Sequence, residues 1–288
     1  MKVLVLGATG MLGHAQLAAL VESPEFEARG TVRAPESLRR LPTALRGAAV
    51  VGGDLERPGA LPALLEAERP DVVINCTSLP KSDLQDPAKA YAFYGVLPRR
   101  LAHLCRERGI RLVQVGSDGV FSGSRGHYGE RDLPDATDVY GTAKLLGEVD
   151  GPGAVTIRTS IVGPELGTRA GLLEWFLAQS GPVRAFDRAM WSGLPTIVLA
   201  RLVRDVILPR PALQGIYHVA SAPVSKYALL RQIAAAWGRE VEWIVDSSVA
   251  IDRTLDASRF REATGWVAPA WAELVNIMHT HHRLSSGA

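Results

Sequence analysis

The sequence has few cysteines, almost no net charge and no long hydrophobic run. Its 288 residues include two cysteines, Cys76 and Cys105, which fit core thiols rather than a disulfide framework or a metal site. The formal net charge is +2, and no basic run carries interleaved aromatic residues, so we expect no nucleic-acid partner. No apolar stretch is long enough to span a bilayer and no signal-type segment precedes the first strand. These absences predict a cytoplasmic protein that does not enter a membrane.

Hydrophobic residues make up 47% of the chain, enough for one large core and a smaller lobe. Apolar runs alternate with segments of helical periodicity, which is typical of a parallel sheet covered on both faces. The expected strands are Val3–Leu6, Glu27–Val32, Val50–Val51, Val72–Asn75, Leu112–Val115, Val155–Arg158 and Ile216–Val219. The expected helices are Leu12–Val21, Leu61–Ala67, Ala88–Arg108, Val139–Asp150 and Thr196–Ile207.

This order of elements predicts an α/β fold, a doubly wound parallel sheet (Rossmann) with a smaller C-terminal substrate-binding lobe. We expect the dinucleotide-binding domain to cover residues 1–160 and about 184–222. The lobe then covers about 161–183 and 223–288. The stretch His279-Thr280-His281-His282 is interpreted as part of a polar, flexible tail rather than as a metal site.

A glycine-rich turn, Gly7-Ala8-Thr9-Gly10-Met11-Leu12-Gly13, joins the first expected strand to the first expected helix. Glycine lets the backbone come close to a pyrophosphate, and the free N–H groups of a helix start attract an anion. The spacing is G-x-x-G-x-x-G rather than G-x-G-x-x-G, and such turns also occur without a ligand. In this strand–turn–helix context it predicts a dinucleotide site that includes Gly7, Thr9, Gly10, Met11 and Leu12.

The second expected strand ends at Arg33, where an NAD-specific domain usually carries an acidic residue. Arg33, together with Arg39 or Arg40, could hold a 2′-phosphate, because a guanidinium group matches phosphate geometry and stays charged. We therefore expect NADPH rather than NADH. The alternative is that these arginines form an ordinary solvated face.

Other polar or small residues follow the ends of the later strands. Since the carboxyl ends of parallel strands meet at one edge of a sheet, we expect their side chains to gather there. The residues added to the cofactor site on this basis are Asp54, Leu55, Cys76, Thr77 and Ser78. Ser117, which follows the strand Leu112–Val115, is expected at the same edge.

The spacing Tyr140-x-x-x-Lys144 places a phenol and an ammonium group one helical turn apart on the same face. A close positive charge lowers the pKa of a phenol, which predicts that Tyr140 is a general acid or base. Lys144 is also expected to contact the cofactor ribose. Ser117 is the expected donor to a substrate carbonyl oxygen. A surface pair is the alternative interpretation of this spacing alone.

Taken together, these segments resemble an extended short-chain dehydrogenase/reductase of the dTDP-4-dehydrorhamnose reductase (RmlD-like) family. The resemblance covers nearly the whole chain. It rests on Gly7–Gly13, Val115–Gly123, Tyr140–Glu148, Gly193–Thr196 and Gly215–Val219. It implies a nicotinamide cofactor and reduction of a 4-keto nucleotide sugar, with Ser117, Tyr140 and Lys144 as the catalytic residues.

The chain departs from the family pattern at several positions. Ser117 stands where the family usually has Thr, and Gly119 where it has an aromatic residue near the sugar. Phe93-Tyr94-Gly95 stands where an Asn is common, and Met190-Trp191 replaces Asp-Gln. We assign Val120, Phe121 and Trp191 to the substrate site. Two roles are open for Trp191: its ring could stack on a sugar or base of the substrate, or it could fill a core.

The sequence thus predicts an NADPH-dependent reductase of a nucleotide-linked 4-keto(-6-deoxy) sugar. A nucleotide-sugar epimerase is one alternative, because an epimerase uses the same residues but keeps its cofactor. A non-catalytic NADP-binding regulatory subunit is another, and the intact Ser117, Tyr140 and Lys144 argue against it. The expected partner is the nucleotide-sugar substrate. Whether the chain forms a homodimer is left open.

Overall fold

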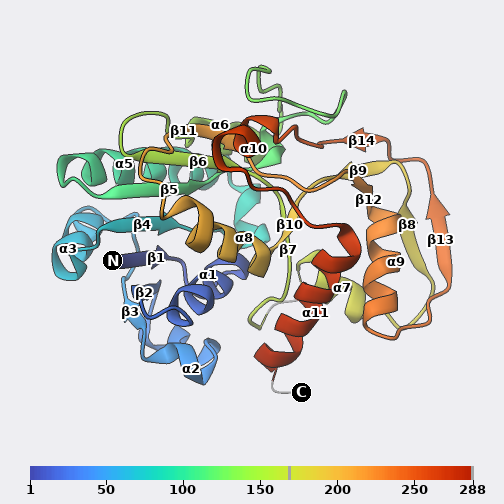
Figure 1. Cartoon of the computed structure of the whole chain (residues 1–288), viewed down its shortest axis with the longest axis horizontal. Coiled ribbons are helices and arrows are strands. Elements are labelled where there is room, and N and C mark those ends of the chain that lie inside the picture. Colours follow the sequence, from blue (N-terminus) through green and yellow to red (C-terminus); the bar gives the residue numbers. More distant parts are fainter. Residues whose placement is uncertain (168–169, 287–288) are drawn as a thin grey trace.

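The computed structural model describes residues 1–167 and 170–286. Within these ranges, seven parallel strands form the central sheet in the order β11-β6-β5-β4-β1-β2-β3 (Figure 1). The strands are β1 (Lys2–Leu6), β2 (Glu27–Val32), β3 (Ala49–Val51), β4 (Val72–Asn75), β5 (Arg111–Val115), β6 (Ala154–Arg158) and β11 (Gly215–His218). This order confirms the predicted doubly wound sheet.

Alternation along the strands explains why both faces of the sheet are covered. Val3 and Val5 of β1 belong to one core cluster, which also includes residues of α1 (Met11–Val21) and α8 (Thr196–Leu202). Leu4 and Leu6 point the other way, into a cluster with α3 (Ala60–Glu68) and α5 (Leu97–Glu107). Successive side chains of a strand point to opposite faces, so one apolar run serves both cores.

The remaining helical segments connect the strands or cover the sheet. They are η1 (Pro35–Arg40), α2 (Thr43–Arg46), η2 (Lys81–Gln85), α4 (Pro87–Ala90), η3 (Tyr91–Val96), η4 (Asp118–Val120), α6 (Val139–Leu146) and η5 (Val203–Ile207). None of the helices in the described part of the chain combines the length and apolar character needed to cross a membrane.

The helix expected over Ala88–Arg108 is continuous but contains the π-helical segment η3 between α4 and α5. Helix α6 ends at Leu146, four residues before the expected end at Asp150. Gly147, the residue after the helix, lies close to η3. A Cβ on Gly147 would overlap the carbonyl oxygen of Tyr94, so the chain touches η3 at the residue where α6 stops.

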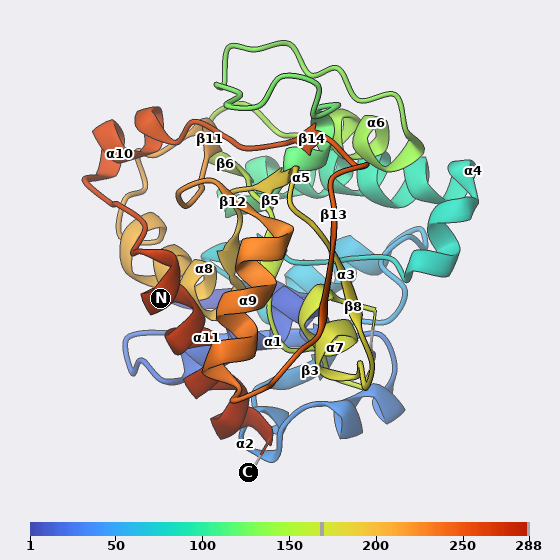
Figure 2. The same ribbon diagram turned by 90° about the vertical axis from the view of Figure 1, so that its right-hand side faces the viewer.

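The C-terminal lobe lies beside the carboxyl ends of the central strands (Figures 1 and 2). It contains three small sheets in the described residues, β10-β7, β12-β9-β14 and β13-β8. Its elements are β7 (Ile161–Val162), α7 (Leu172–Leu177), β8 (Val183–Phe186), β9 (Ala189–Trp191), β10 (Leu194–Pro195), β12 (Val224–Ser225), α9 (Lys226–Ala236), β13 (Trp243–Asp246), β14 (Ile251–Asp252) and α10 (Ser258–Thr264). The segment 184–222 supplies β11 to the central sheet, whereas β8 and β9 pair with lobe strands. The division into two domains stays a prediction.

The interpretation of the C-terminal histidines as a flexible tail is wrong. They lie on helix α11 (Trp271–Ser286), which packs against α8 and α9 (Figure 2). Met278 is fully buried, and the ring of His281 stacks on that of His14 with centroids 6.4 Å apart. Apolar residues spaced along this segment, including Leu274 and Val275, bury one helix face and order the histidines with it.

Protonation of the buried imidazoles should weaken the fold below pH 6.5. Burial lowers the pKa of His281 and of His218 to about 4, so the unfolded chain binds protons more readily than the folded one. The stabilisation that comes from keeping these imidazoles neutral is therefore present above pH 6.5, their ordinary pKa in the unfolded chain, and is lost as the pH falls towards 4. We expect a loss of about 1–3 kcal/mol per residue in the free energy of unfolding. His281→Leu should reduce this pH dependence in urea titrations, and an unchanged dependence would contradict the assignment.

Candidate active site and cofactor cleft

A cavity of about 800 Å³ lies at the carboxyl ends of the central strands, facing the lobe. Every residue that the sequence assigned to the cofactor lines it. These are Gly7, Thr9, Gly10, Met11, Leu12, Arg33, Asp54, Leu55, Cys76, Thr77, Ser78 and Lys144. Ser117 and Tyr140 line it as well. The strand order thus brings segments that are more than 100 residues apart to one cleft.

The glycine-rich turn is built for close backbone packing. Gly7 has a φ of 82°, a left-handed conformation that favours glycine, and its carbonyl accepts a hydrogen bond from the N–H of Gly10 at 3.0 Å. A Cβ on Gly13 would overlap the carbonyl oxygen of Gly7. The start of α1 can therefore lie against the turn, with its free N–H groups at the cavity.

The end of the cavity beside β2 is lined by Arg33, Ser37 and Arg40. The side chain of Arg40 donates to the carbonyl of Leu166 at 2.8 Å, so it is held by the opposite wall. Arg39 is not among the residues that line the cavity. The sequence offered Arg39 and Arg40 as equal companions of Arg33, and the geometry favours Arg40.

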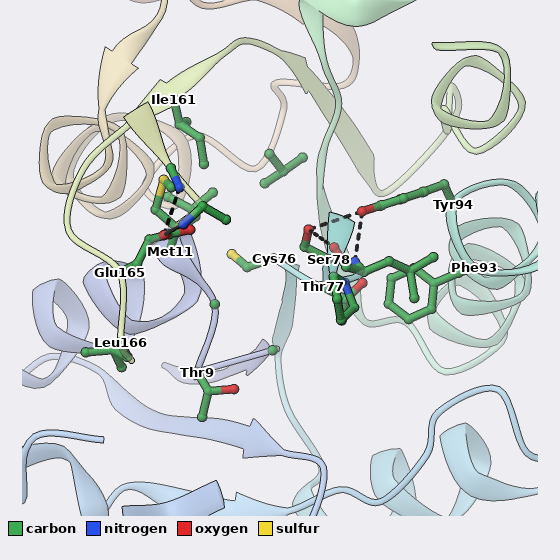
Figure 3. A pocket seen from close by; sticks show the side chains of 18 of the residues that line it. Thr9, Met11, Cys76, Thr77, Ser78, Phe93, Tyr94, Ile161, Glu165 and Leu166 are labelled. Carbon is green, nitrogen blue, oxygen red and sulfur yellow. Dashed lines mark hydrogen bonds between the residues drawn. The ribbon is translucent and has the colours of Figure 1, made fainter. Parts of the chain in front are cut away.

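Sequence reasoning missed the wall that the lobe contributes. Thr159, Ser160 and Ile161 directly follow β6, and Glu165, Leu166 and Leu172 lie further along the same segment (Figure 3). The carboxylate of Glu165 accepts from the N–H of Gly171 at 2.8 Å, which ties these two residues together at the cavity wall. Thr159 could have been predicted to line the cavity, because it follows a central strand and the residues after the other strands were assigned to the site for that reason.

Ser117 and Tyr140 both line the cavity and contact each other. The hydroxyl of Tyr140 donates to the Oγ of Ser117 at 3.4 Å, and the N–H of Gly119 donates to the same Oγ at 3.0 Å. Tyr140 lies in the first turn of α6, which begins where the carboxylate of Asp138 accepts from the N–H of Gly141 at 2.8 Å. The cap fixes the start of the helix and with it the direction of the phenol.

Lys144 lies one helical turn after Tyr140, with its ammonium buried beside β5. It donates to the carbonyl oxygen of Val115 at 2.8 Å, at the last residue of that strand. Burial lowers the pKa of Lys144 to about 8, against the opposing effects of Glu148 and Cys76. The side chain is therefore mostly charged at neutral pH.

The predicted lowering of the Tyr140 pKa is not what the structure shows. Burial raises the pKa of Tyr140 well above its ordinary value, and the hydrogen bond with Ser117 offsets only part of this effect. The nearby phenol of Tyr94 and the carboxylates of Asp118 and Asp138 raise this pKa further. The phenol keeps its proton at neutral pH, as a proton donor must.

Asp118 is a second buried acid beside this centre. Burial raises the pKa of Asp118 to about 6, although Arg253 and the hydroxyl of Ser117 favour its ionised form. The Oγ of Ser117 donates to its carboxylate at 3.4 Å. Cys76 also lines the cavity, and burial raises the pKa of its thiol to about 12, so it is not a nucleophile near neutrality.

The three residues assigned to the substrate lie outside the lining of this cavity. Val120 and Phe121 are fully buried in a core cluster with Tyr128, whose ring stacks on that of Phe121 with centroids 4.2 Å apart. Trp191 is partly buried and packs against Trp271, with ring centroids 5.4 Å apart. Their roles towards the substrate stay predictions, as do the roles of the cofactor residues.

A buried ion pair anchors the chain just after α6. The guanidinium of Arg158 donates to both carboxylate oxygens of Glu148, at 2.6 and 2.8 Å, and the side chains are 4% and 6% exposed. Arg158 also contacts the imidazole of His218 at 3.2 Å. Among the described residues, no group of three or more His, Cys, Asp or Glu side chains could hold a metal ion.

Comparison with known proteins gives one family and several relatives. The family described as "RmlD substrate binding domain" matches residues 1–281. A dTDP-4-dehydrorhamnose reductase of Streptomyces griseus is 34% identical over 153 residues, covering 50% of this chain and 43% of that protein. The chain therefore spans less than half of that relative's length. A protein of Haloferax volcanii, named a probable low-salt glycan biosynthesis reductase, is 30% identical over 215 residues, covering 69% and 70%.

A relative of a different kind also matches. The methionine adenosyltransferase 2 subunit beta of Danio rerio is 27% identical over 250 residues, covering 82% of this chain and 74% of that protein. Among solved structures, a dTDP-4-dehydrorhamnose reductase of Clostridium acetobutylicum has a TM-score of 0.80 at 21% identity, covering 98% and 100%. A dTDP-4-dehydrorhamnose reductase of Bacillus anthracis, solved in complex with NADP, has a TM-score of 0.80 at 19% identity, covering 97% of this chain and 99% of that chain. At these identities the structural likeness establishes the fold.

Removing one partner of the buried ion pair should destabilise the chain strongly. We expect Glu148→Gln to lower the free energy of unfolding by about 3–5 kcal/mol, because it leaves the Arg158 charge buried without its counter-ion. The double variant Glu148→Leu/Arg158→Met should recover much of this loss, since it buries no charge. Urea denaturation of the three proteins measures both effects. A double variant no more stable than the single one would show that the charges are needed for packing in this region.

Proposed function

The chain belongs to the RmlD substrate binding domain family, and from this membership and the site we propose that it is an NADPH-dependent reductase of a nucleotide-linked 4-keto(-6-deoxy) sugar. One observation carries the proposal. One cavity is lined by Ser117, Tyr140 and Lys144, by the glycine-rich turn and by Arg33. The Streptomyces griseus relative named above supports the substrate class.

The residues present fit a dinucleotide. The left-handed conformation of Gly7 and the close packing of Gly13 on the Gly7 carbonyl bring the glycine-rich turn against the start of α1, whose free N–H groups can bind a pyrophosphate. We expect Arg33, Ser37 and Arg40, which line the cavity, to hold a 2′-phosphate. Lys144 would contact the ribose next to the nicotinamide. When bound, NADPH would supply the hydride that reduces the ketone.

The chain's own residues handle the substrate oxygen and its proton. The Ser117 hydroxyl donates to the ketone oxygen and orients it, with its own position fixed by the N–H of Gly119. Tyr140 holds a proton at neutral pH and gives it to the same oxygen as negative charge develops there. The ammonium of Lys144 stabilises the phenolate that remains, because a positive charge favours the ionised form.

A regulatory subunit without turnover is the second candidate, and the relative from Danio rerio is the observation that favours it. An epimerase is a third, since its residues would be the same. The three functions differ in what happens to the cofactor. A reductase consumes NADPH in proportion to the ketone, an epimerase retains it, and a regulatory subunit binds it without turnover.

Turnover of NADPH should depend on Tyr140. We expect the purified chain to oxidise NADPH in the presence of a nucleotide-linked 4-keto-6-deoxy sugar, and Tyr140→Phe to lower kcat by at least about 100-fold, because it removes the proton donor. The affinity for NADPH should stay the same. The loss of absorbance of reduced nicotinamide across a small panel of such sugars measures this. Near-normal reduction by Tyr140→Phe would refute the assignment, and NADPH binding without oxidation would favour the other two candidates.

The preference for NADPH should depend on Arg33. We expect Arg33→Asp to shift the ratio of kcat/KM for NADPH over NADH towards NADH by at least about tenfold, because a carboxylate repels the 2′-phosphate and can bind ribose hydroxyls. Arg39→Asp makes the same change of charge outside the cavity lining and is the matched control. Equal shifts in both variants would indicate a general charge effect and remove Arg33 from the site.

A further inference from the structure

Tyr94 is a buried side chain that touches both members of the catalytic pair. It is 5% exposed and lines the cavity. Its ring packs edge to face with that of Tyr140, with centroids 5.4 Å apart and an angle of 84° between the planes. The Nζ of Lys144 lies 5.2 Å from the centre of the Tyr94 ring. The ring therefore contacts the proposed acid and the cation that supports it.

The hydroxyl group of Tyr94 holds a different part of the cavity wall. It accepts a hydrogen bond from the N–H of Leu79 at 2.8 Å and shares another with the Oγ of Ser78 at 3.1 Å (Figure 3). Both residues follow β4 and line the cavity. The hydroxyl is thus bound to the wall that begins at Cys76 and Thr77, on the side opposite Met11 and Glu165 (Figure 3).

Close packing of η3 on α6 places the ring. A Cβ on Gly147 would overlap the carbonyl oxygen of Tyr94, and one on Gly95 would lie 2.7 Å from the side chain of Leu146. Glycine at both positions lets the two helices approach at the turn that carries Tyr94. The π-helical turn lies in the same segment, as such turns often do near functional groups.

We propose that Tyr94 is a positioning residue of this site, whose ring holds the Lys144 ammonium and whose hydroxyl holds residues 78–79 against the cavity. The inference rests on the proposed function for its catalytic meaning, but its contacts lie within the chain. The face of an aromatic ring attracts a cation, and the attraction is stronger where water is excluded. Burial makes the Lys144 charge costly, and the ring offsets part of that cost.

Few other groups can act on the Lys144 charge. Its ammonium donates to the carbonyl of Val115 on β5. Glu148, beyond the end of α6, and Cys76, after β4, are the titratable groups that favour its charged form. Glu148 is already paired with Arg158, and the Cys76 thiol is neutral at physiological pH. The Tyr94 ring is thus the contact that a single substitution can remove without altering charge.

The first test measures the titration of Lys144 directly. The chain has five lysines, so their ¹³Cε signals can be followed by NMR and that of Lys144 assigned with Lys144→Arg. In the wild-type chain we expect a midpoint at about pH 8. Tyr94→Phe keeps the ring and should keep the midpoint. Tyr94→Met fills the space without a ring and should lower it by about 0.5–1.5 in pH.

Leu101→Ala is the control for general destabilisation, since Leu101 is buried on α5 in the same core cluster but does not line the cavity. It should lower the melting temperature and leave the Lys144 midpoint unchanged. If Tyr94→Met has the same midpoint as Tyr94→Phe, or a higher one, the ring does not hold the ammonium and this part of the inference is refuted.

The second test concerns the hydrogen bond that the Tyr94 hydroxyl accepts from the N–H of Leu79. Tyr94→Phe removes the acceptor of the Leu79 N–H, so that amide should exchange with solvent about tenfold faster, and NADPH should bind about threefold to tenfold more weakly. Unchanged exchange at Leu79 would refute the role of the hydroxyl. Both tests read contacts in the chain itself. If the wild-type chain reduces no sugar, the proposed function fails, while the NMR midpoint and the exchange rate still decide this inference.

Discussion

Burial of both faces of the central sheet is the constraint on which the rest of the molecule depends. Each strand buries apolar side chains on both faces, as Val3 and Leu4 show, and the polar side chains buried within strands, such as Gln114 and Thr156, are held by hydrogen bonds. All strands of the sheet are parallel, so their carboxyl ends lie along one edge. The glycine turn, Arg33 and Ser117 lie at that edge for this reason. The lobe then closes over the edge and converts it into a cavity.

Much of the fold and the centre of the site follow from short-range patterns. An apolar run, a glycine turn and a helical repeat each predict the local structure of a few residues. Because the carboxyl ends of parallel strands meet at one edge of the sheet, these local predictions also indicate which segments lie close together. Ser117, Tyr140 and Lys144 could therefore be predicted to share a cavity, as they do. Both cysteines were interpreted as core thiols, and both are buried.

What could not be predicted depends on packing between distant segments. Helix α11 is ordered because Met278 and Leu274 bury one of its faces, whereas the histidines alone suggested a tail. Gly147, just after α6, lies against the carbonyl of Tyr94, about 50 residues away in sequence, and nothing in the local pattern indicates this contact. The rise in the Tyr140 pKa has the same origin, since the enclosure that causes it comes from several elements. The spacing of Tyr140 and Lys144 predicts that they lie on one helix face, but it does not predict the residues around them, which determine the pKa values.

The charges around the site favour an anionic oxygen at its centre. Glu148 lies one helical turn after Lys144, where a lone carboxylate would cancel the ammonium charge. It is instead bound through both oxygens to Arg158, so the pair is close to neutral. Burial raises the pKa of Asp118 to about 6, so this carboxylate is still mostly ionised at neutral pH, and the charge of Arg253 favours that form. The Lys144 ammonium, one helical turn after Tyr140, is thus not paired with the Glu148 carboxylate. In the proposed reduction its positive charge would stabilise the negative charge that develops on the ketone oxygen. The ion pair that ties α6 to β6 therefore also preserves the electrostatic asymmetry that the proposed reduction requires.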